Sequence, residues 1–344
     1  MSNIFYKNQF VTLYCGDCIE VLEELSGPFN LLVADPPYSF VKKNETWDQC
    51  SHAELETILR KLFELIKPKM KNNGAVYCFC WPYFSARMQY IMADYFNVLN
   101  EIVWMKRGAS GAQCGNQAKV SLEKLRKYFP ETERIVFADI YESDKKSFSD
   151  SYQLWCEIMQ PLISYFNEAK RQIGLSVDGI KEKMFQLTGK RYTSAHHAFN
   201  RIDWRFPTLE QYSAMEKFMP MLRDQYYNLR GQYNNLLDQY NNLRRAHYPQ
   251  RNNFTDLWIY SPIPGGSKQR LHSCQKPLNM IVDMINTSSR PGDIVLDPFA
   301  GSGTTGVAAI KTGRQAILIE REEKYCEMAA KRIEQESTDF FDIN

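Results

Sequence analysis

Residues 293–320 constrain the fold of this chain more than any other segment. An apolar stretch ending at Asp297 is followed by the turn Phe-Ala-Gly-Ser-Gly, a helix-compatible stretch to about residue 311, and a second apolar stretch closed by Glu320. Short apolar runs bounded by glycine indicate buried strands. Strand, glycine turn, helix and strand in this order predict a βαβ unit, and therefore an α/β fold.

The turn of this unit has the features of a nucleotide-type binding site. Gly301 and Gly303 allow the backbone to approach a ligand closely, and the helix that follows offers free N–H groups to an anion. Glu320, at the end of the second strand, can accept hydrogen bonds from two ribose hydroxyls. A dinucleotide would fit as well, but Gly-Ser-Gly-Thr-Thr differs from G-x-G-x-x-G and no P-loop lysine follows. NAD and ATP are therefore weaker interpretations.

A second apolar run, residues 29–34, leads directly into Asp35, Pro36, Pro37 and Tyr38. The prolines end strand pairing and stiffen the turn, so a carboxylate, backbone carbonyls and an aromatic ring are held together at the carboxyl end of a strand. In open α/β sheets, ligands bind at this edge. The alternative for these four residues is a proline-rich strand exit with an N-capping aspartate.

The same four residues suit methylation of an exocyclic amine on a planar base. The lone pair of such an amine is delocalised into the ring, so the amine is a poor nucleophile. The Asp35 carboxylate and the Pro36 carbonyl can both accept hydrogen bonds from the NH2 group, which holds it and favours its pyramidal form. Tyr38 offers a face on which a flipped base can stack.

Together the two motifs resemble those of the DNA amino-methyltransferases that use S-adenosylmethionine (AdoMet). The segment Phe-Ala-Gly-Ser-Gly-Thr-Thr resembles their cofactor motif and Asp-Pro-Pro-Tyr their catalytic motif. Here the catalytic motif comes first, as in the permuted β group of N6-adenine and N4-cytosine enzymes. The resemblance implies an α/β fold with a permuted Rossmann-like sheet, in which the strands before Asp35 and Asp297 can be neighbours, interrupted by a helical target-recognition domain.

The resemblance also implies residue roles. An aspartate opening the catalytic motif is similar to the adenine enzymes, whereas the cytosine enzymes more often carry serine, so the expected product is N6-methyladenine. N4-cytosine methylation, an RNA substrate and an inactive DNA-binding homologue stay open as alternatives, and so does the proton acceptor, Asp35 or water. The residues expected to bind AdoMet are Asp17, Lys276, Asp297, Phe299, Ala300, Gly301, Ser302, Gly303, Thr304, Thr305 and Glu320.

Residues 148–250 have a helical pattern with a turn that resembles a helix-turn-helix reader of DNA. Residues 151–250 carry 13 Lys and Arg against 9 Asp and Glu, a mild basic excess. We expect this block to recognise the target, although a bracing helical insertion has the same pattern. The residues expected to contact double-stranded DNA are Trp47, Lys106, Arg107, Lys190, Arg191, His196 and His197. Lys106 and Arg107 precede a polar loop, residues 108–115, for which DNA contact and a plain surface loop are equally compatible.

Three heptads follow within residues 225–245. Tyr226, Tyr233 and Tyr240 share one seam position, and three leucines share the other. This is a short coiled-coil pattern. Packing inside the insertion, a homodimer contact and contacts to DNA all stay open.

Composition agrees with an intracellular DNA enzyme. The 344 residues contain no run of 18 apolar residues and no signal peptide at the N-terminus, so we expect a cytoplasmic protein of a bacterium or phage, away from membranes. The nine cysteines are expected to be reduced, and their spacing favours no metal site. The expected domains are residues 1–147 (catalytic part), 148–250 (recognition) and 251–344 (AdoMet-binding part). A cognate restriction enzyme is an open possibility.

Overall fold

The structure is a computed structural model that describes residues 4–39, 48–106, 131–140, 147–201, 203–243, 246–248, 255–264, 267 and 274–343. The chain divides into two compact units. Unit 1 comprises Met1–Glu142 and Arg245–Asn344, and unit 2 comprises Ser143–Arg244. Within the described ranges, no helix is both long enough and apolar enough to span a membrane.

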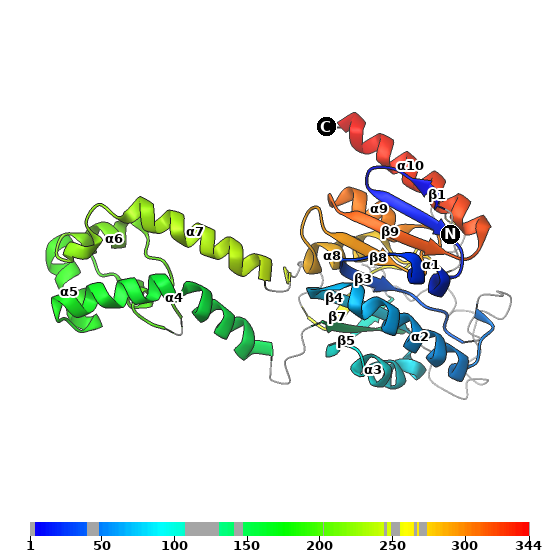
Figure 1. Ribbon diagram of the computed structural model, residues 1–344, viewed down its shortest axis with the longest axis horizontal. Helices are drawn as coiled ribbons and strands as arrows, with labels where there is room; N and C mark the ends of the chain where they lie inside the picture. The colour runs from blue at the N-terminus through cyan, green and yellow to red at the C-terminus, as the bar shows by residue number, and fades with distance from the viewer. Residues whose placement is uncertain are drawn as a thin grey trace. The chain divides into compact units, whose positions relative to one another are not determined.

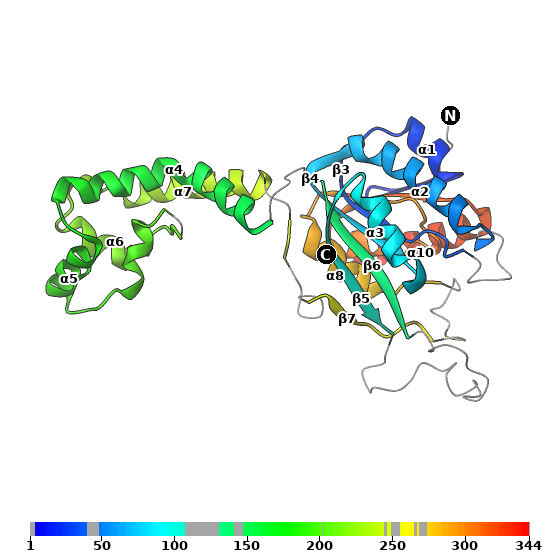
Figure 2. The same ribbon diagram turned by 90° about the horizontal axis from the view of Figure 1, so that it is seen from below.

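Unit 1 is built on one sheet with the strand order β1-β2-β9-β8-β3-β4-β6-β5-β7. Neighbouring strands run parallel except where β1 meets β2 and where β6 lies between β4 and β5. Figure 2 shows β6 beside β5. The strands are β1 (Ile4–Lys7), β2 (Val11–Cys15), β3 (Phe29–Ala34), β4 (Met70–Cys80), β5 (Asn97–Met105), β6 (Thr132–Asp139), β7 (Leu257–Ile259), β8 (Ile294–Asp297) and β9 (Gln315–Glu320).

Helices cover both faces of this sheet (Figure 1). One face is covered by α1 (Cys18–Glu24), α2 (His52–Ile66) and α3 (Ser85–Ala93). The other is covered by α8 (Leu278–Ser288), α9 (Thr304–Lys311) and α10 (Glu323–Ile343). Side chains alternate along β3, so Leu32 packs toward the first face and Leu31 toward the second. Because both faces are covered, β3 is buried along its whole length, which explains its continuous apolar sequence.

The βαβ unit predicted from residues 293–320 is confirmed as β8, α9 and β9. Strands β8 and β9 pair in parallel, with Val295 opposite Ala316. Strand β3, which leads into the Asp-Pro-Pro-Tyr motif, lies beside β8, with Leu31 opposite Val295 and Leu32 opposite Leu296. The two motifs are about 260 residues apart in the sequence but follow adjacent parallel strands, so both emerge at the same edge of the sheet.

Unit 2 is helical, and its described residues form four α-helices around an aromatic core. Phe166, Trp204 and Tyr212 are among its fully buried side chains. The helices are α4 (Ser147–Ile173), α5 (Val177–Thr188), α6 (Leu209–Glu216) and α7 (Tyr226–Leu243). Gly174 (φ +67°) directly follows the last residue of α4, and Ser176 caps α5. Residues Thr193–Ala198 form a short 3-10 helix.

The heptads of α7 pack inside unit 2. Leu229 is buried, and Tyr226 and Tyr233 pack against the same core. The Tyr240 ring meets Trp155 of α4 edge-on, with 5.0 Å between ring centroids. The seam ends at the surface, because 56% of Leu243 is exposed. Of the three interpretations of the heptads, these contacts support packing within the insertion.

Candidate active site

A cavity of about 280 Å³ lies at the carboxyl edge of the unit 1 sheet. It is reached by the segments that follow β2, β3, β8 and β9, four strands that run in the same direction. Every residue of the catalytic motif lines it, as do most of the residues expected to bind the cofactor. Its lining includes Asp17, Asp35, Pro36, Pro37, Tyr38, Lys276, Asp297, Phe299, Ala300, Gly301, Ser302, Thr304, Thr305 and Glu320.

The glycine turn after β8 is tied to the end of β9. One oxygen of the Glu320 carboxylate accepts a hydrogen bond from the Gly301 N–H and the other from the Glu322 N–H, both at 2.8 Å. Gly303 has a φ of +75°, and a Cβ there would lie 2.9 Å from the Cβ of Ala329 in α10. The turn therefore requires glycine for its backbone and for its packing. Burial raises the pKa of Glu320.

Asp297 closes β8 beneath the turn. Its two carboxylate oxygens accept hydrogen bonds from the Phe299 N–H (3.0 Å) and the Thr305 hydroxyl (2.5 Å). Only 5% of Asp297 is exposed, and burial raises its pKa to about 7. Asp297 therefore connects the strand, the turn and the first residues of α9, and it sets the shape of the turn.

A residue outside the expected set also braces this turn. The Arg332 guanidinium, from α10, donates to the Ser302 carbonyl (3.2 Å) and to the Thr304 hydroxyl (3.0 Å). The sequence carries no motif around Arg332, because the contact joins segments about 30 residues apart through helix packing.

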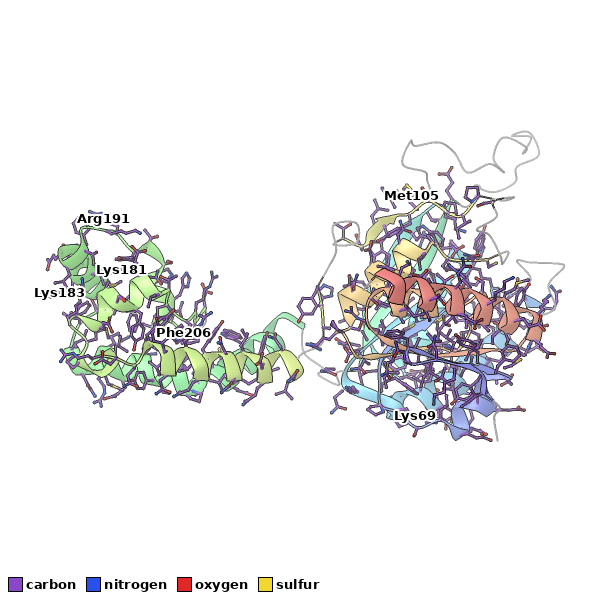
Figure 3. The ribbon with its side chains drawn as sticks, turned by 90° about the horizontal axis from the view of Figure 1, so that it is seen from above. Lys69, Met105, Lys181, Lys183, Arg191 and Phe206 are labelled. Carbon is purple, nitrogen blue, oxygen red and sulfur yellow. The ribbon has the colours of Figure 1, made fainter. Side chains whose placement is uncertain are left out.

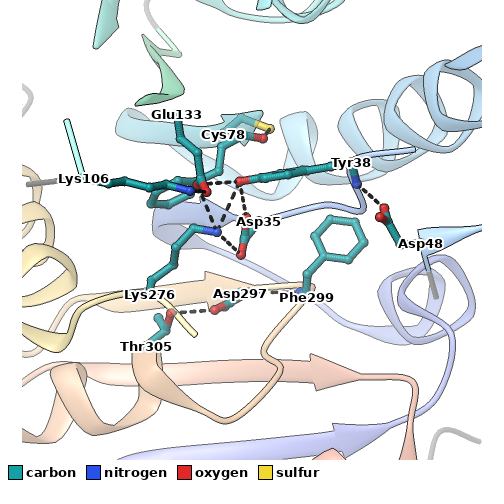
Figure 4. A network of polar contacts seen from close by, with 11 residues as sticks. Asp35, Tyr38, Asp48, Cys78, Lys106, Glu133, Lys276, Asp297, Phe299 and Thr305 are labelled. Atoms are coloured by element: carbon teal, nitrogen blue, oxygen red, sulfur yellow. Dashed lines mark hydrogen bonds and ion pairs between the residues drawn. The ribbon is translucent and has the colours of Figure 1, made fainter. Parts of the chain in front are cut away.

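Asp35 has both carboxylate oxygens occupied by side-chain donors (Figure 4). The Tyr38 hydroxyl donates to Oδ1 at 2.9 Å, and the Lys276 ammonium lies 2.6 Å from Oδ2. The Tyr38 backbone N–H donates to buried Asp48 at 2.6 Å. Lys276 was expected among the cofactor residues. Its ammonium instead contacts the catalytic motif, although its side chain lines the common cavity.

Glu133, on β6, is the main residue of the site that the sequence analysis missed. Its Oε2 accepts a hydrogen bond from the Tyr38 hydroxyl at 2.9 Å and lies 3.4 Å from the Lys276 ammonium. Its other oxygen forms an ion pair with Lys106. Only 6% of Glu133 is exposed. The available signal was an acid just before the apolar run Ile135, Val136, Phe137 and Ala138 of β6, since buried charges are found where partners exist.

The four charged groups stabilise one another. Burial alone would favour neutral carboxyls, yet Lys276 and Lys106 hold the pKa of Glu133 below its usual value. Burial raises the pKa of Asp35, and Lys276 opposes this increase. Asp35 and Glu133 raise the pKa of Lys276 despite its burial. Burial and the two carboxylates also raise the pKa of Tyr38, so its hydroxyl keeps its proton and acts as a donor.

The residues expected to contact DNA fall into three groups. Trp47, Arg107 and the loop 108–115 lie outside the described residues. Lys106 is described, and its ammonium forms an ion pair with Glu133. In unit 2, exposed Lys190 binds Glu210 at 2.7 Å, the exposed Arg191 guanidinium lies 5.0 Å from the centre of the Phe185 ring, and His196 and His197 contact the carbonyls of Thr193 and Asp203.

Comparison with known proteins agrees with this geometry. Residues 29–331 match the family model for N6/N4 DNA methylases. The fold is that of an α/β methyltransferase, and the matched range covers both motifs and most of the chain. The chain belongs to the N6/N4 DNA methylase family. As a member of this family it uses AdoMet as its methyl donor and DNA as its substrate.

Individual relatives are more distant. The DNA adenine methyltransferase YhdJ of Escherichia coli (strain K12) is 27% identical over 260 residues, covering 67% of this chain and 87% of YhdJ. The type II methyltransferase M.HinfI of Haemophilus influenzae is 41% identical over 93 residues, covering 25% of this chain and 26% of M.HinfI.

Two solved structures share the fold. The M1.HpyAVI–SAM complex has a TM-score of 0.51 at 17% identity, covering 94% of this chain and 98% of that one. The cytosine-N4-specific PvuII DNA methyltransferase has a TM-score of 0.53 at 13% identity, covering 99% of this chain and 94% of that one. At these identities the likeness concerns the fold alone.

The cavity lining fits AdoMet. Glu320 and Asp17 supply carboxylates at the ends of β9 and β2, where a ribose diol and a ring amine can donate hydrogen bonds. Phe299, Ile19 and Tyr325 add apolar and aromatic surface for the adenine ring. Ser302 and Thr304, in and just after the turn, line the same cavity and complete a set of polar groups and apolar walls that fits the parts of this cofactor.

Proposed function

We propose that this chain methylates the exocyclic N6 amine of an adenine flipped out of double-stranded DNA, at a specific sequence. The observation that carries the proposal is that Asp35 and the glycine turn held by Asp297 and Glu320 line one cavity, at the ends of adjacent parallel strands. An amine held at Asp35 is then next to the segment suited to the cofactor, which is the requirement for direct methyl transfer.

AdoMet, when bound, supplies an electrophilic methyl group. The residues that hold it in this proposal are Asp17, Asp297, Phe299, Ala300, Gly301, Ser302, Gly303, Thr304, Thr305 and Glu320. Asp297 and Glu320 also maintain the turn through their backbone contacts. Lys276 lines the same cavity and remains a proposed cofactor contact, and its ammonium, 2.6 Å from an Asp35 oxygen, also orients that carboxylate.

Asp35 and the Pro36 carbonyl orient the target amine. Both are acceptors, so they bind the two N–H bonds and direct the nitrogen lone pair toward the methyl group. Pro36 and Pro37 keep the acceptors fixed, and Tyr38 provides a ring against the base. The Trp81 ring is 6.4 Å from that of Tyr38, so aromatic surface continues along this side of the site.

Adenine is favoured over cytosine because the motif opens with aspartate, and because the relative matched over most of its length is named as an adenine methyltransferase. Long-read modification mapping of DNA from cells expressing the chain tests this choice. We expect N6-methyladenine at one recurring sequence, and none with the Asp35→Ala variant as a matched control. N4-methylcytosine in its place would overturn the assignment of the base.

The segment proposed as the target-recognition domain is the one expected from the sequence, residues 148–250, most of which falls in unit 2 (Ser143–Arg244). Basic side chains gather around α5: Lys183 and Arg191 are exposed, and Figure 3 shows Lys181, Lys183 and Arg191 around this helix. The Lys190–Glu210 pair is exposed and therefore weak, so Lys190 can exchange Glu210 for a DNA phosphate. His196 and His197 are proposed to lie at the edge of the same interface.

Replacing Lys190 and Arg191 with alanine is expected to weaken DNA binding and leave AdoMet binding unchanged. Each lost phosphate contact should lower the log–log salt slope by about 0.9. DNA affinity is measured at several salt concentrations. The matched control is Lys61→Ala/Lys71→Ala, two exposed lysines of unit 1. The same affinity and slope in a folded Lys190/Arg191 variant as in the unmodified chain would remove this pair from the DNA interface.

A further inference from the structure

The Tyr38 hydroxyl lies between two carboxylates, at 2.9 Å from an oxygen of Asp35 and 2.9 Å from an oxygen of Glu133. A hydroxyl has one proton and can donate it to one acceptor at a time. We propose that Glu133 is a positioning residue that accepts the hydrogen bond of the Tyr38 hydroxyl when the target amine binds to Asp35. The inference rests on the proposed function and adds a residue that neither motif contains.

The need for a second acceptor follows from the occupancy of Asp35. Its Oδ1 accepts from Tyr38 and its Oδ2 from Lys276. A base amine that donates to Oδ1 competes with the Tyr38 hydroxyl for that oxygen. Glu133 removes this competition because the Tyr38 O–H bond can rotate from Asp35 to Glu133. The hydroxyl then keeps a hydrogen bond while the amine takes Oδ1 of Asp35. An unsatisfied hydroxyl in this buried place would otherwise cost free energy.

The surroundings keep Tyr38 in place while its O–H bond rotates. At one end of the residue, the backbone N–H is bound to Asp48; at the other, the oxygen is already in contact with both acceptors. The Lys276 ammonium also lies 3.2 Å from the Tyr38 oxygen. The switch therefore requires rotation about the C–O bond alone, and the ring remains available to the base.

Glu133 is held ready for this role. It lies on β6, where it pairs with Trp104 of β5, and the next residue, Arg134, pairs with both β4 and β5, so the backbone at Glu133 is held within the sheet. Lys106 forms an ion pair with it and is itself placed over the rings of Trp81 and Trp104, at 5.9 and 5.2 Å. With Lys106 and Lys276 as partners, Glu133 stays charged, and a charged carboxylate is the stronger acceptor.

The test is a double-mutant cycle of Glu133→Gln and Tyr38→Phe in the full-length chain. Glu133→Gln keeps the shape but replaces the charged acceptor with a weaker neutral one. We expect it to slow single-turnover methyl transfer about 10- to 100-fold at saturating AdoMet and DNA. AdoMet affinity should stay within about threefold, because the change is on the base side of the cavity.

In the Tyr38→Phe background no hydroxyl competes for Asp35. Adding Glu133→Gln should then slow transfer by less than about threefold, so the two changes are strongly non-additive. The matched control is Glu101→Gln, which removes a carboxylate from an ion pair with Arg134 on the neighbouring strand. This control should leave the rate of methyl transfer unchanged in each background: equal to that of the unmodified chain when Tyr38 is present, and equal to that of Tyr38→Phe alone in the other background.

Additive effects would overturn the proposal and would mean that Glu133 acts only through the charges of the two lysines. A Glu133→Gln rate equal to that of the unmodified chain would also overturn it. Failure of the proposed function has a different signature, because the unmodified chain would then bind AdoMet but transfer no methyl group to DNA.

Discussion

Replacing Asp35 with alanine is expected to lower the single-turnover rate of methyl transfer by at least about a thousandfold, while AdoMet affinity stays within about tenfold. The substitution removes the acceptor proposed to position the amine, whereas the turn proposed to bind the cofactor follows the adjacent strand, β8. The fold should survive, because Glu133 remains 3.4 Å from the Lys276 ammonium and continues to balance its charge.

Labelled AdoMet and a DNA duplex containing the mapped site provide the measurement. Asp94→Ala is the matched control, because Asp94 is a carboxylate of unit 1 whose ion-pair partner, Arg60, lies at the surface. The control should retain full activity. A folded Asp35→Ala variant that transfers methyl groups at a near-normal rate would disprove the catalytic assignment of the Asp-Pro-Pro-Tyr motif.

Replacing Glu320 with alanine is expected to weaken AdoMet binding by about a hundredfold or more. The cofactor would lose a carboxylate that can bind two hydroxyls, and a charge-assisted hydrogen bond contributes about 1.5–3 kcal/mol. The structure adds a second cause: Glu320 accepts from the Gly301 and Glu322 N–H groups, so its loss also loosens the turn.

Titration calorimetry measures this affinity directly. Glu327→Ala, an exposed acid on α10, is the control and should bind AdoMet like the unmodified chain. A change in Glu320→Ala of less than about threefold, in a protein that remains folded, would contradict the proposed placement of the cofactor. The rate of methyl transfer at saturating AdoMet should recover in part, which separates this variant from Asp35→Ala.

Much of unit 1 could be predicted because its signals are local. Apolar runs closed by Asp35 and Asp297 specify β3 and β8, and the glycines at 301 and 303 specify the turn between β8 and α9. These patterns depend on the neighbouring few residues, so they survive without knowledge of the rest of the fold. The adjacency of β3 and β8 was expected from the resemblance and is confirmed by their pairing.

The network around Tyr38 could not be predicted in the same way. Glu133 and Lys276 reach Tyr38 across 95 and 238 residues of sequence, and neither contact leaves a periodic or spacing signal. The resemblance placed Lys276, which precedes the strand of the cofactor motif in the sequence, among the cofactor-binding residues. The strand order of the sheet brings its ammonium to Asp35.

The sequence by itself determined the class of fold, the two motifs and the family, because hydrophobic periodicity and turn chemistry act over short distances. Only the tertiary structure decided which charges meet. It brought Asp35, Glu133 and Lys276 together around the Tyr38 hydroxyl and paired Lys106 with Glu133. It also placed the α7 seam within unit 2. The physical reason is that a buried charge must find its partners in space, and strand order and helix packing choose those partners without regard to distance along the chain.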